Sequence, residues 1–560
     1  MRIRVSEFEP SNPRIFKSSH PQLLEYSNTQ LPFMATITRL ARIIIVITTV
    51  SAAIMELVDI SIVNVALSQM AGSLGVTIED VSWVITSYAI ANVIIIPMTG
   101  FLAAYFGRKN YYVFSMILFT AASWMCGSST GLWELVFWRF IQGIGGGALL
   151  STSQGILFDA FEPKDRPMAS GLFGMGIVLG PTLGPTIGGY ILNTSEWPLI
   201  FTVNIPIGIV ATILSILFVE KKPGEGEQKQ GFVIDYIGIA LLAIGIGSLQ
   251  YVLERGESED WLSSGTIRIL SVSALVGVVG FIWRQLTTPH PVVNLRVMGN
   301  RTLALTTIFT FVIGIGLFTS VFVYPILAQR ILGMTPLETG LSLLPATAVG
   351  VVMMPIIGKR MAGGTSPVPF VIVGFLLFIV FGWMSAGVNA QAGKWDFFWP
   401  LALRAVGISM VQLPLINQAV AGLKPQDYPS GIALNNMIRQ LGGAFGIAIS
   451  NNYMARQFAQ HKTDLVANTV PGNPAFDERL NTMIQGIMSR TGAVVSDATE
   501  IAYRQLNYAV EKQAYLLTYL DTFRLISLFF IIVFPLIFFI KIKKPGPPSQ
   551  AAKAAMEDAH

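Results

Sequence analysis

The 560-residue sequence has few charges, one cysteine and four histidines. Charged residues make up 12% of the chain, and a soluble domain carries about twice that share. The single Cys126 excludes a disulfide framework and a cysteine-rich metal site. His20, His290, His461 and His560 lie in polar segments or at the terminus. Without a histidine inside an apolar run, neither a metal site nor a membrane enzyme is expected, and we expect no cofactor.

Two further features are missing. No GxxxxGK[ST] phosphate-binding loop occurs, so ATP is not expected to supply the energy of any transport cycle. We expect no cleavable signal at the N-terminus, because residues 1–36 are polar and the first apolar run contains no small-residue cleavage site. Met34 in "MATITRLARIII" is an alternative start. The net charge of +5 is spread over short loops, which indicates membrane topology and no nucleic-acid partner.

What the sequence has is apolar length: 52% of the residues are hydrophobic and the mean hydropathy is +0.59. Fourteen runs are long enough to span a bilayer, at about 20 residues each. They lie near residues 41–67, 81–104, 111–128, 132–157, 167–192, 199–219, 232–253, 266–286, 303–328, 336–358, 368–388, 397–421, 429–453 and 516–540. Lys and Arg gather in alternate loops, so we expect both termini on the cytoplasmic side. The sequence therefore predicts an all-α integral membrane protein.

A repeat relates the two ends of this array. "PMTG" at 97–100 matches "PIIG" at 355–358, "WRFIQG" at 138–143 matches "LRAVG" at 403–407, and "SGLFGMG" at 170–176 matches "SGIALNN" at 430–436, each at an offset of about 260 residues. Two six-helix bundles with two inserted helices between them would give this pattern. The expected units are a tail 1–36, a bundle 37–220, the insertion 221–300, a bundle 301–541 that includes an outer segment 456–515, and a tail 542–560.

Several stretches are similar to the major facilitator superfamily, and within it to fourteen-span drug:proton antiporters of the EmrB/QacA type. "LVDISIVNVAL" resembles a signature of the first span, "RFIQGIGGG" a buried-arginine motif, and "GIVLGPTLGPTIGG" at 176–189 the antiporter motif. "GFLAAYFGRK" at 100–109 resembles the superfamily loop, although Ala104 replaces the usual acid. The resemblance implies the major facilitator fold. It also assigns loop-motif roles to Gly100, Gly107, Arg108 and Lys109.

The first span carries two carboxyls, Glu56 and Asp59, on one helix face. Two ionised acids facing lipid would cost about 5 to 7 kcal/mol, so they must face a cavity or a partner, or carry protons. Arg139 in the fourth span needs an anion, a cluster of carbonyl groups or water, and in the resembling transporters this arginine lies near the proton-binding acid. We expect proton coupling by Asp59, Glu56 and Arg139. The alternative is a static ion pair that only holds the bundle together.

The antiporter motif places glycines at every fourth residue of the fifth span. We expect this face to seal the two bundles together and to limit uncoupled leakage. The motif residues are Gly176, Gly180, Pro181, Gly184, Pro185, Gly188 and Gly189. Polar and aromatic residues at span positions are candidates for an apolar substrate cavity. They are Asn64, Trp83, Tyr88, Gln142, Gln154, Tyr324, Gln412, Asn417, Asn435, Asn436 and Arg439.

These features favour a proton-coupled exporter of amphiphilic or drug-like compounds in a bacterial inner membrane, working by alternating access. The first alternative is an exporter of one physiological metabolite or lipid on the same fold. The second is a transport-inactive scaffold or sensor. The resemblance further implies transporters that hand cargo to a membrane-fusion adaptor and an outer-membrane channel. Segment 456–515 is the candidate dock, and the alternative for it is a set of amphipathic surface helices.

Overall fold

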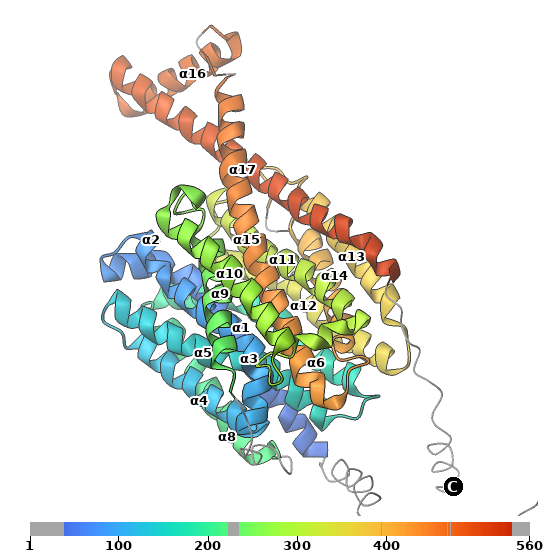
Figure 1. Cartoon of the computed structure of the whole chain (residues 1–560). Coiled ribbons are helices and arrows are strands. Elements are labelled where there is room, and N and C mark those ends of the chain that lie inside the picture. The colour runs from blue at the N-terminus through green and yellow to red at the C-terminus, as the bar shows by residue number, and fades with distance from the viewer. Residues whose placement is uncertain (1–38, 222–233, 394, 468, 471, 540–560) are drawn as a thin grey trace, which may run out of the picture.

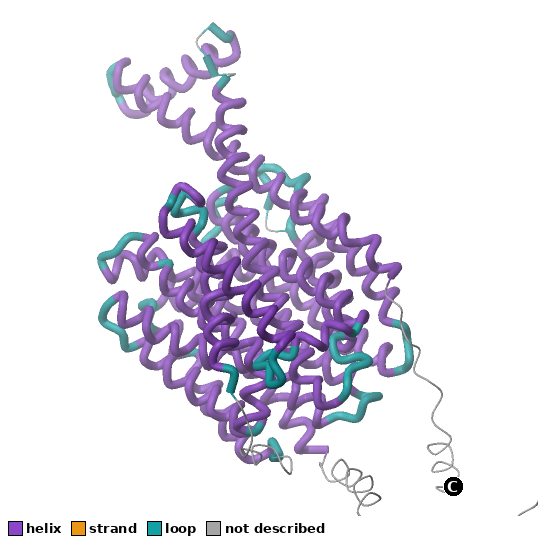
Figure 2. The backbone as a smooth tube through the Cα atoms, viewed as in Figure 1, coloured by secondary structure: helices purple, strands orange, loops and turns teal. Residues whose placement is uncertain are grey.

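The computed structural model describes residues 39–221 and 234–539, except 394, 468 and 471. Within these ranges the regular elements are helices joined by short loops (Figure 2). The expected tails 1–36 and 542–560 lie outside the described residues, as does much of the polar segment before the inserted helices.

The helices follow the predicted runs closely. They are α1 (Arg39–Leu74), α2 (Ile78–Val81), α3 (Trp83–Phe106), α4 (Arg108–Gly127), α5 (Leu132–Ala160), α6 (Arg166–Thr194), α7 (Leu199–Thr202), α8 (Asn204–Phe218), α9 (Tyr236–Arg255), α10 (Gly265–Thr287), α11 (Arg301–Arg330), α12 (Pro336–Ala362), α13 (Pro367–Ser385), α14 (Phe398–Gln418), α15 (Tyr428–Val466), α16 (Pro474–Thr491) and α17 (Val495–Val533). Short 3-10 helices cover Trp261–Ser263, Leu295–Gly299, Pro425–Asp427 and Phe534–Phe539. Among the described residues, eleven candidates are long and apolar enough to span a membrane, and three of them are made of adjacent helical elements. Three other helices, α4, α5 and α15, lie outside this set and pack among its members.

The repeat in the sequence recurs in the packing. In the first half, α1 packs on α6, α3 on α5 and α4 on α8; in the second half, α11 packs on α15, α12 on α14 and α13 on α17. The sequence repeat maps each of these helix pairs in the first half onto one of the pairs in the second half. The halves meet where α6 lies against α12 and where α3 lies against α15.

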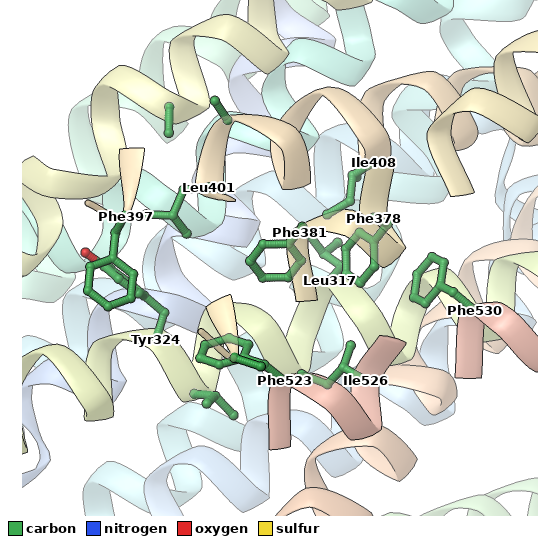
Figure 3. Packing of buried hydrophobic residues seen from close by; sticks show 14 of the residues in the cluster. Leu317, Tyr324, Phe378, Phe381, Phe397, Leu401, Ile408, Phe523, Ile526 and Phe530 are labelled. Atoms are coloured by element: carbon green, nitrogen blue, oxygen red, sulfur yellow. The ribbon is translucent and has the colours of Figure 1, made fainter. Parts of the chain in front are cut away.

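The core of the second half is rich in aromatic rings (Figure 3). Phe378 stacks on Phe530 with ring centroids 4.0 Å apart, and Phe381 meets Phe523 edge-on at 5.8 Å. These rings join α13 to α17. Because offset and edge-to-face pairs add to the gain from burial, these ring contacts help to hold the second half together.

The inserted helices α9 and α10 pack on each other, and α9 also contacts α3 and α15. The pair therefore touches both halves. Among the described residues of 456–515, α15 and α17 extend beyond the bundle and, with α16, form a projecting hairpin (Figure 1). At its neck Phe458 stacks on Tyr515 at 4.0 Å, and Lys462 Nζ pairs with Glu511 Oε1 at 2.7 Å.

The bundle end opposite the hairpin carries Arg108, Arg166 and Lys359, and we call it the basic end. Gly107 has φ of 83° between α3 and α4, a backbone conformation that glycine adopts readily. This allows the abrupt turn between the two helices. At the other end, Thr335 and Glu338 form a capping box that begins α12.

Candidate functional site

Asp59 of α1 is the centre of a buried polar cluster in the first half. Its Oδ2 accepts a hydrogen bond from Arg139 Nη1 at 2.6 Å, and its Oδ1 accepts from Gln142 Nε2 at 2.9 Å and Asn204 Nδ2 at 2.7 Å. Asp59 is 0% exposed and Arg139 1%. The two oxygens thus meet three donors from α5 and α8, and a buried carboxylate needs such partners to remain charged.

Arg139 is held from several sides. Its Nε donates to the carbonyl of Val84 at 3.1 Å, and Nη1 also donates to Gln142 Oε1 at 2.7 Å. The guanidinium lies 4.3 Å from the centroid of the Tyr88 ring, a distance at which a cation is attracted to the ring face. Arg139 therefore has partners other than Asp59, so it can keep its place if Asp59 becomes neutral.

Glu56 lies one turn from Asp59 and has different partners. Its Oε1 accepts from Asn92 Nδ2 at 3.3 Å, and its Oε2 accepts from the backbone N of Leu150 at 3.1 Å. The side chain is 2% exposed. Both of these donors are neutral. The two acids thus share a helix face and differ in charge compensation.

The halves are joined at the basic end. Arg166 lies 5.3 Å from the Tyr428 ring centroid, and Ser170 Oγ donates to Asn417 Oδ1 at 3.3 Å. Apolar residues of α5 and α6 pack there against α14 and α15, with Phe158 and Val420 in one buried cluster. In this conformation the basic end is closed.

The glycine face of α6 corrects one expectation. A Cβ on Gly184 would lie 2.8 Å from the backbone N of Ile62, and one on Gly188 would lie 2.8 Å from Cγ1 of the same residue. Gly176 and Gly180 likewise face α1. This face therefore packs α6 on the acid-bearing helix of its own half and does not seal the halves together. Residues on another side of α6 contact α12; Gly189 is one, since a Cβ there would lie 2.7 Å from the backbone N of Leu337.

Comparisons with known proteins agree with this arrangement. A model of the Major Facilitator Superfamily matches residues 49–447. The chain belongs to this superfamily.

The names of relatives refer to export or to resistance. The chain is 33% identical over 424 residues to the multidrug export protein EmrB of Escherichia coli (strain K12), covering 76% of this chain and 82% of that protein. It is 30% identical to the fatty acid resistance protein FarB of Neisseria gonorrhoeae, over 88% and 94% of the two chains. It is 28% identical to a colistin resistance protein EmrB of Acinetobacter baumannii, over 88% and 94%.

A solved structure shares the fold. The crystal structure of the human organic anion transporter MFSD10 (TETRAN) aligns with a TM-score of 0.55 at 13% identity, covering 89% of this chain and 99% of that one. Together, the superfamily match and the relatives make this chain a multi-pass membrane transporter of the efflux kind and not an enzyme.

The loop motif of the superfamily lies at the basic end. Arg108 forms an ion pair with Asp159 at the end of α5, and its Nη1 donates to the Gly155 carbonyl at 3.3 Å. Lys109 Nζ donates to the Ile216 carbonyl at 2.7 Å. A Cβ on Gly100 would lie 3.3 Å from the backbone of Pro429. The two basic residues of the loop motif thus bind groups of α5 and α8.

Nine of the eleven cavity candidates separate into three groups. Tyr88 and Gln142 belong to the Asp59 cluster. Gln154, Gln412, Asn417, Asn435, Asn436 and Arg439 come from α5, α14 and α15, helices that meet at the boundary between the halves. The amide of Gln412 and Nε2 of Gln154 have no hydrogen-bond partner although they are buried. Asn64 is exposed on α1. A polar layer thus lies at the boundary.

Two aromatic candidates are corrected. Trp83 packs between Trp133 and Tyr251, with ring centroids 6.1 and 5.5 Å away, and so joins α3 to an inserted helix. Tyr324 lies in the aromatic core, 5.3 Å from Phe397, and its hydroxyl bonds to Ser342 at 2.6 Å. Large aromatic rings gain most from close packing, and Trp83 and Tyr324 are both closely packed against other rings.

Three residues of the cluster were missed by the sequence analysis. Asn204 and Asn92 donate to the two acids, and Ser123 Oγ accepts from Asn204 at 3.0 Å. The available signal was an amide inside an apolar helix, which is costly unless it has a partner. The sequence does not say which partner that is.

Proposed function

We propose that this transporter is a proton-coupled exporter of amphiphilic, drug-like compounds that works by alternating access between its two halves. The observation that carries the proposal is the Asp59–Arg139 pair at 2.6 Å, fully buried and attached to two separate helices. A proton on Asp59 would remove the charge that Arg139 binds. Only a ligand that binds two conformations unequally can shift their balance, and this proton would be such a ligand.

The buried polar layer supports the substrate class. Unpartnered amides of Gln154 and Gln412 beside apolar walls would give a cargo a few hydrogen bonds within a mainly hydrophobic site. The names of the relatives refer to multidrug export, fatty acid resistance and colistin resistance. These compounds have apolar bodies with polar or charged groups. We infer the same chemical class for this chain.

The driving force in this proposal is the proton gradient across a bacterial inner membrane. One charge that crosses 100 mV releases about 2.3 kcal/mol. The basic end would face the cytoplasm, because loops rich in Lys and Arg are retained there. In that orientation the present conformation is closed toward the cytoplasm. A state open on the hairpin side would bind protons and release cargo.

The hairpin of α15, α16 and α17 is the proposed contact for a membrane-fusion adaptor and, through it, an outer-membrane channel. Its support is geometric, since it projects from the bundle on the side opposite the basic end (Figure 1). Pull-down of a co-expressed adaptor by the full chain, compared with a variant lacking residues 474–491, tests this part separately.

Efflux measured in proteoliposomes tests the main proposal. A pH step should drive substrate transport by the natural protein, and Asp59→Asn should abolish the dependence on the gradient. Gradient-driven transport by both Asp59→Asn and Glu56→Gln would remove the mechanism. A substrate panel with one tight ligand would favour a dedicated metabolite or lipid exporter. Absence of transport by the natural protein itself would favour a scaffold or sensor.

A further inference from the structure

Arg439 of α15 is a buried cation that lies outside the Asp59 cluster of the first half. It is 6% exposed, and its Nε has no hydrogen-bond partner. Among the described residues of the second half, acids occur at helix ends, in loops and in the hairpin and its neck, not near the middle of a span. A guanidinium in such a place needs an anion, carbonyl oxygens or water. The buried acids of α1 in the first half, Glu56 and Asp59, are candidates for that anion.

Asp59 is already committed to Arg139, Gln142 and Asn204. Glu56 is the other buried acid of α1, and both of its hydrogen-bond donors are neutral. A carboxyl with neutral donors and a guanidinium without a hydrogen-bond partner at Nε are complementary. Glu56 is therefore the candidate counter-charge of Arg439.

Contacts between the halves bring the two residues to one level of the bundle. Leu150 donates its backbone N to Glu56, and the adjacent Ser151 Oγ accepts from Asn436 Nδ2 of α15 at 3.0 Å. Arg439 follows Asn436 by one helical turn. A short chain of contacts thus joins the acid in one half to the cation in the other.

We propose that Glu56 and Arg439 form a charge couple across the two halves, and that a proton on Glu56 releases the couple and favours opening of the basic end. This inference rests on the proposed function as a proton-coupled exporter. It assigns the two acids different tasks: Asp59 acts within the first half, and Glu56 controls how the halves meet.

The surroundings of Glu56 fit this task. The titratable or charged groups that face it are Asp59 on its own helix, Tyr88 on α3 and Arg439 on α15. A small cavity between α3, α5 and α15 includes Ser151 in its lining and extends to Arg108.

Spin-label distances at the basic end test the inference in the full chain. Cysteines would replace Lys164 and Lys424, which are exposed on opposite halves, and the native Cys126 is buried. In lipid nanodiscs, acidification should raise the open population of the natural protein by tenfold or more. Glu56→Gln and Arg439→Gln should each be open at high pH and insensitive to pH. The double variant should match the single ones, because both remove the same couple.

Controls separate this couple from general damage. Arg404→Gln removes another buried arginine of the second half, whose Nη1 donates to Ser320 Oγ at 3.3 Å, and should keep the pH response. Glu56→Asp should keep it with a shifted midpoint. A retained pH response in Glu56→Gln, or additive effects of Glu56→Gln and Arg439→Gln, would overturn the inference. If Asp59→Asn still exports with the gradient, the proposed function fails instead, whatever the labels report.

Discussion

Asp59→Asn is the most informative single change, because it removes one charge and few atoms. In the natural protein the carboxylate accepts three hydrogen bonds, one of them from Arg139. The amide keeps one oxygen, and its NH₂ group would face donors. Arg139 then remains buried without its anion.

The expected cost follows from what remains around Arg139. Breaking a buried ion pair by removal of one partner costs about 3 to 5 kcal/mol. The Val84 carbonyl, Gln142 Oε1 and the Tyr88 ring still stabilise the guanidinium. We therefore expect a loss near the lower limit, about 3 kcal/mol, visible as a lower melting temperature in detergent.

Asp235→Asn is the matched control. Asp235 also pairs with an arginine, at 3.1 Å, but the Arg284 side chain is 35% exposed. Partly exposed pairs contribute little, and asparagine can still cap α9 at this position. The melting temperature of this variant should stay close to that of the natural protein. Equal melting temperatures for Asp59→Asn and the natural protein, together with unchanged gradient-driven efflux, would refute the reasoning.

Three further predictions concern packing. Gly184→Val should separate α6 from α1 and lower both the melting temperature and transport, whereas Gly72→Val, where a Cβ meets nothing within 4 Å, should have only a small effect. Arg166→Ala removes a cation–π contact worth about 0.5 to 1 kcal/mol and should raise the open population at the basic end two- to fivefold in spin-label distances; Lys164→Ala should not. Phe476→Asp places a charge at a buried position of α16, so limited proteolysis should cleave the hairpin faster while transport without an adaptor is retained. Unchanged proteolysis would show that α16 does not depend on this side chain.

The sequence predicted the helices well because the signal is local. An apolar run of about 20 residues must be a helix in lipid, since its backbone groups have no other partners. Thus the predicted run 303–328 is α11 (Arg301–Arg330). Boundaries differed where polar residues continue a helix beyond the apolar run, as in α17, which begins at Val495.

The site was predicted less completely. Asp59 and Arg139 stood out because a charge in an apolar helix is costly anywhere it lies. Asn204 did not, because its cost depends on a partner 145 positions earlier in the chain. The glycine face of α6 shows the same limit: its period was evident, but the helix against which it packs was not.

The sequence alone determined that this chain crosses a membrane many times, that it consists of two related halves, and that acids and an arginine must find partners inside it. Composition and spacing carry that information because burial in lipid penalises each polar group individually. The tertiary structure decided which partner each one has. It paired Asp59 with Arg139 within one half, gave Glu56 neutral donors beside the second half, and turned the glycines of α6 toward α1, since contacts between distant segments depend on how the helices pack and not on any one segment.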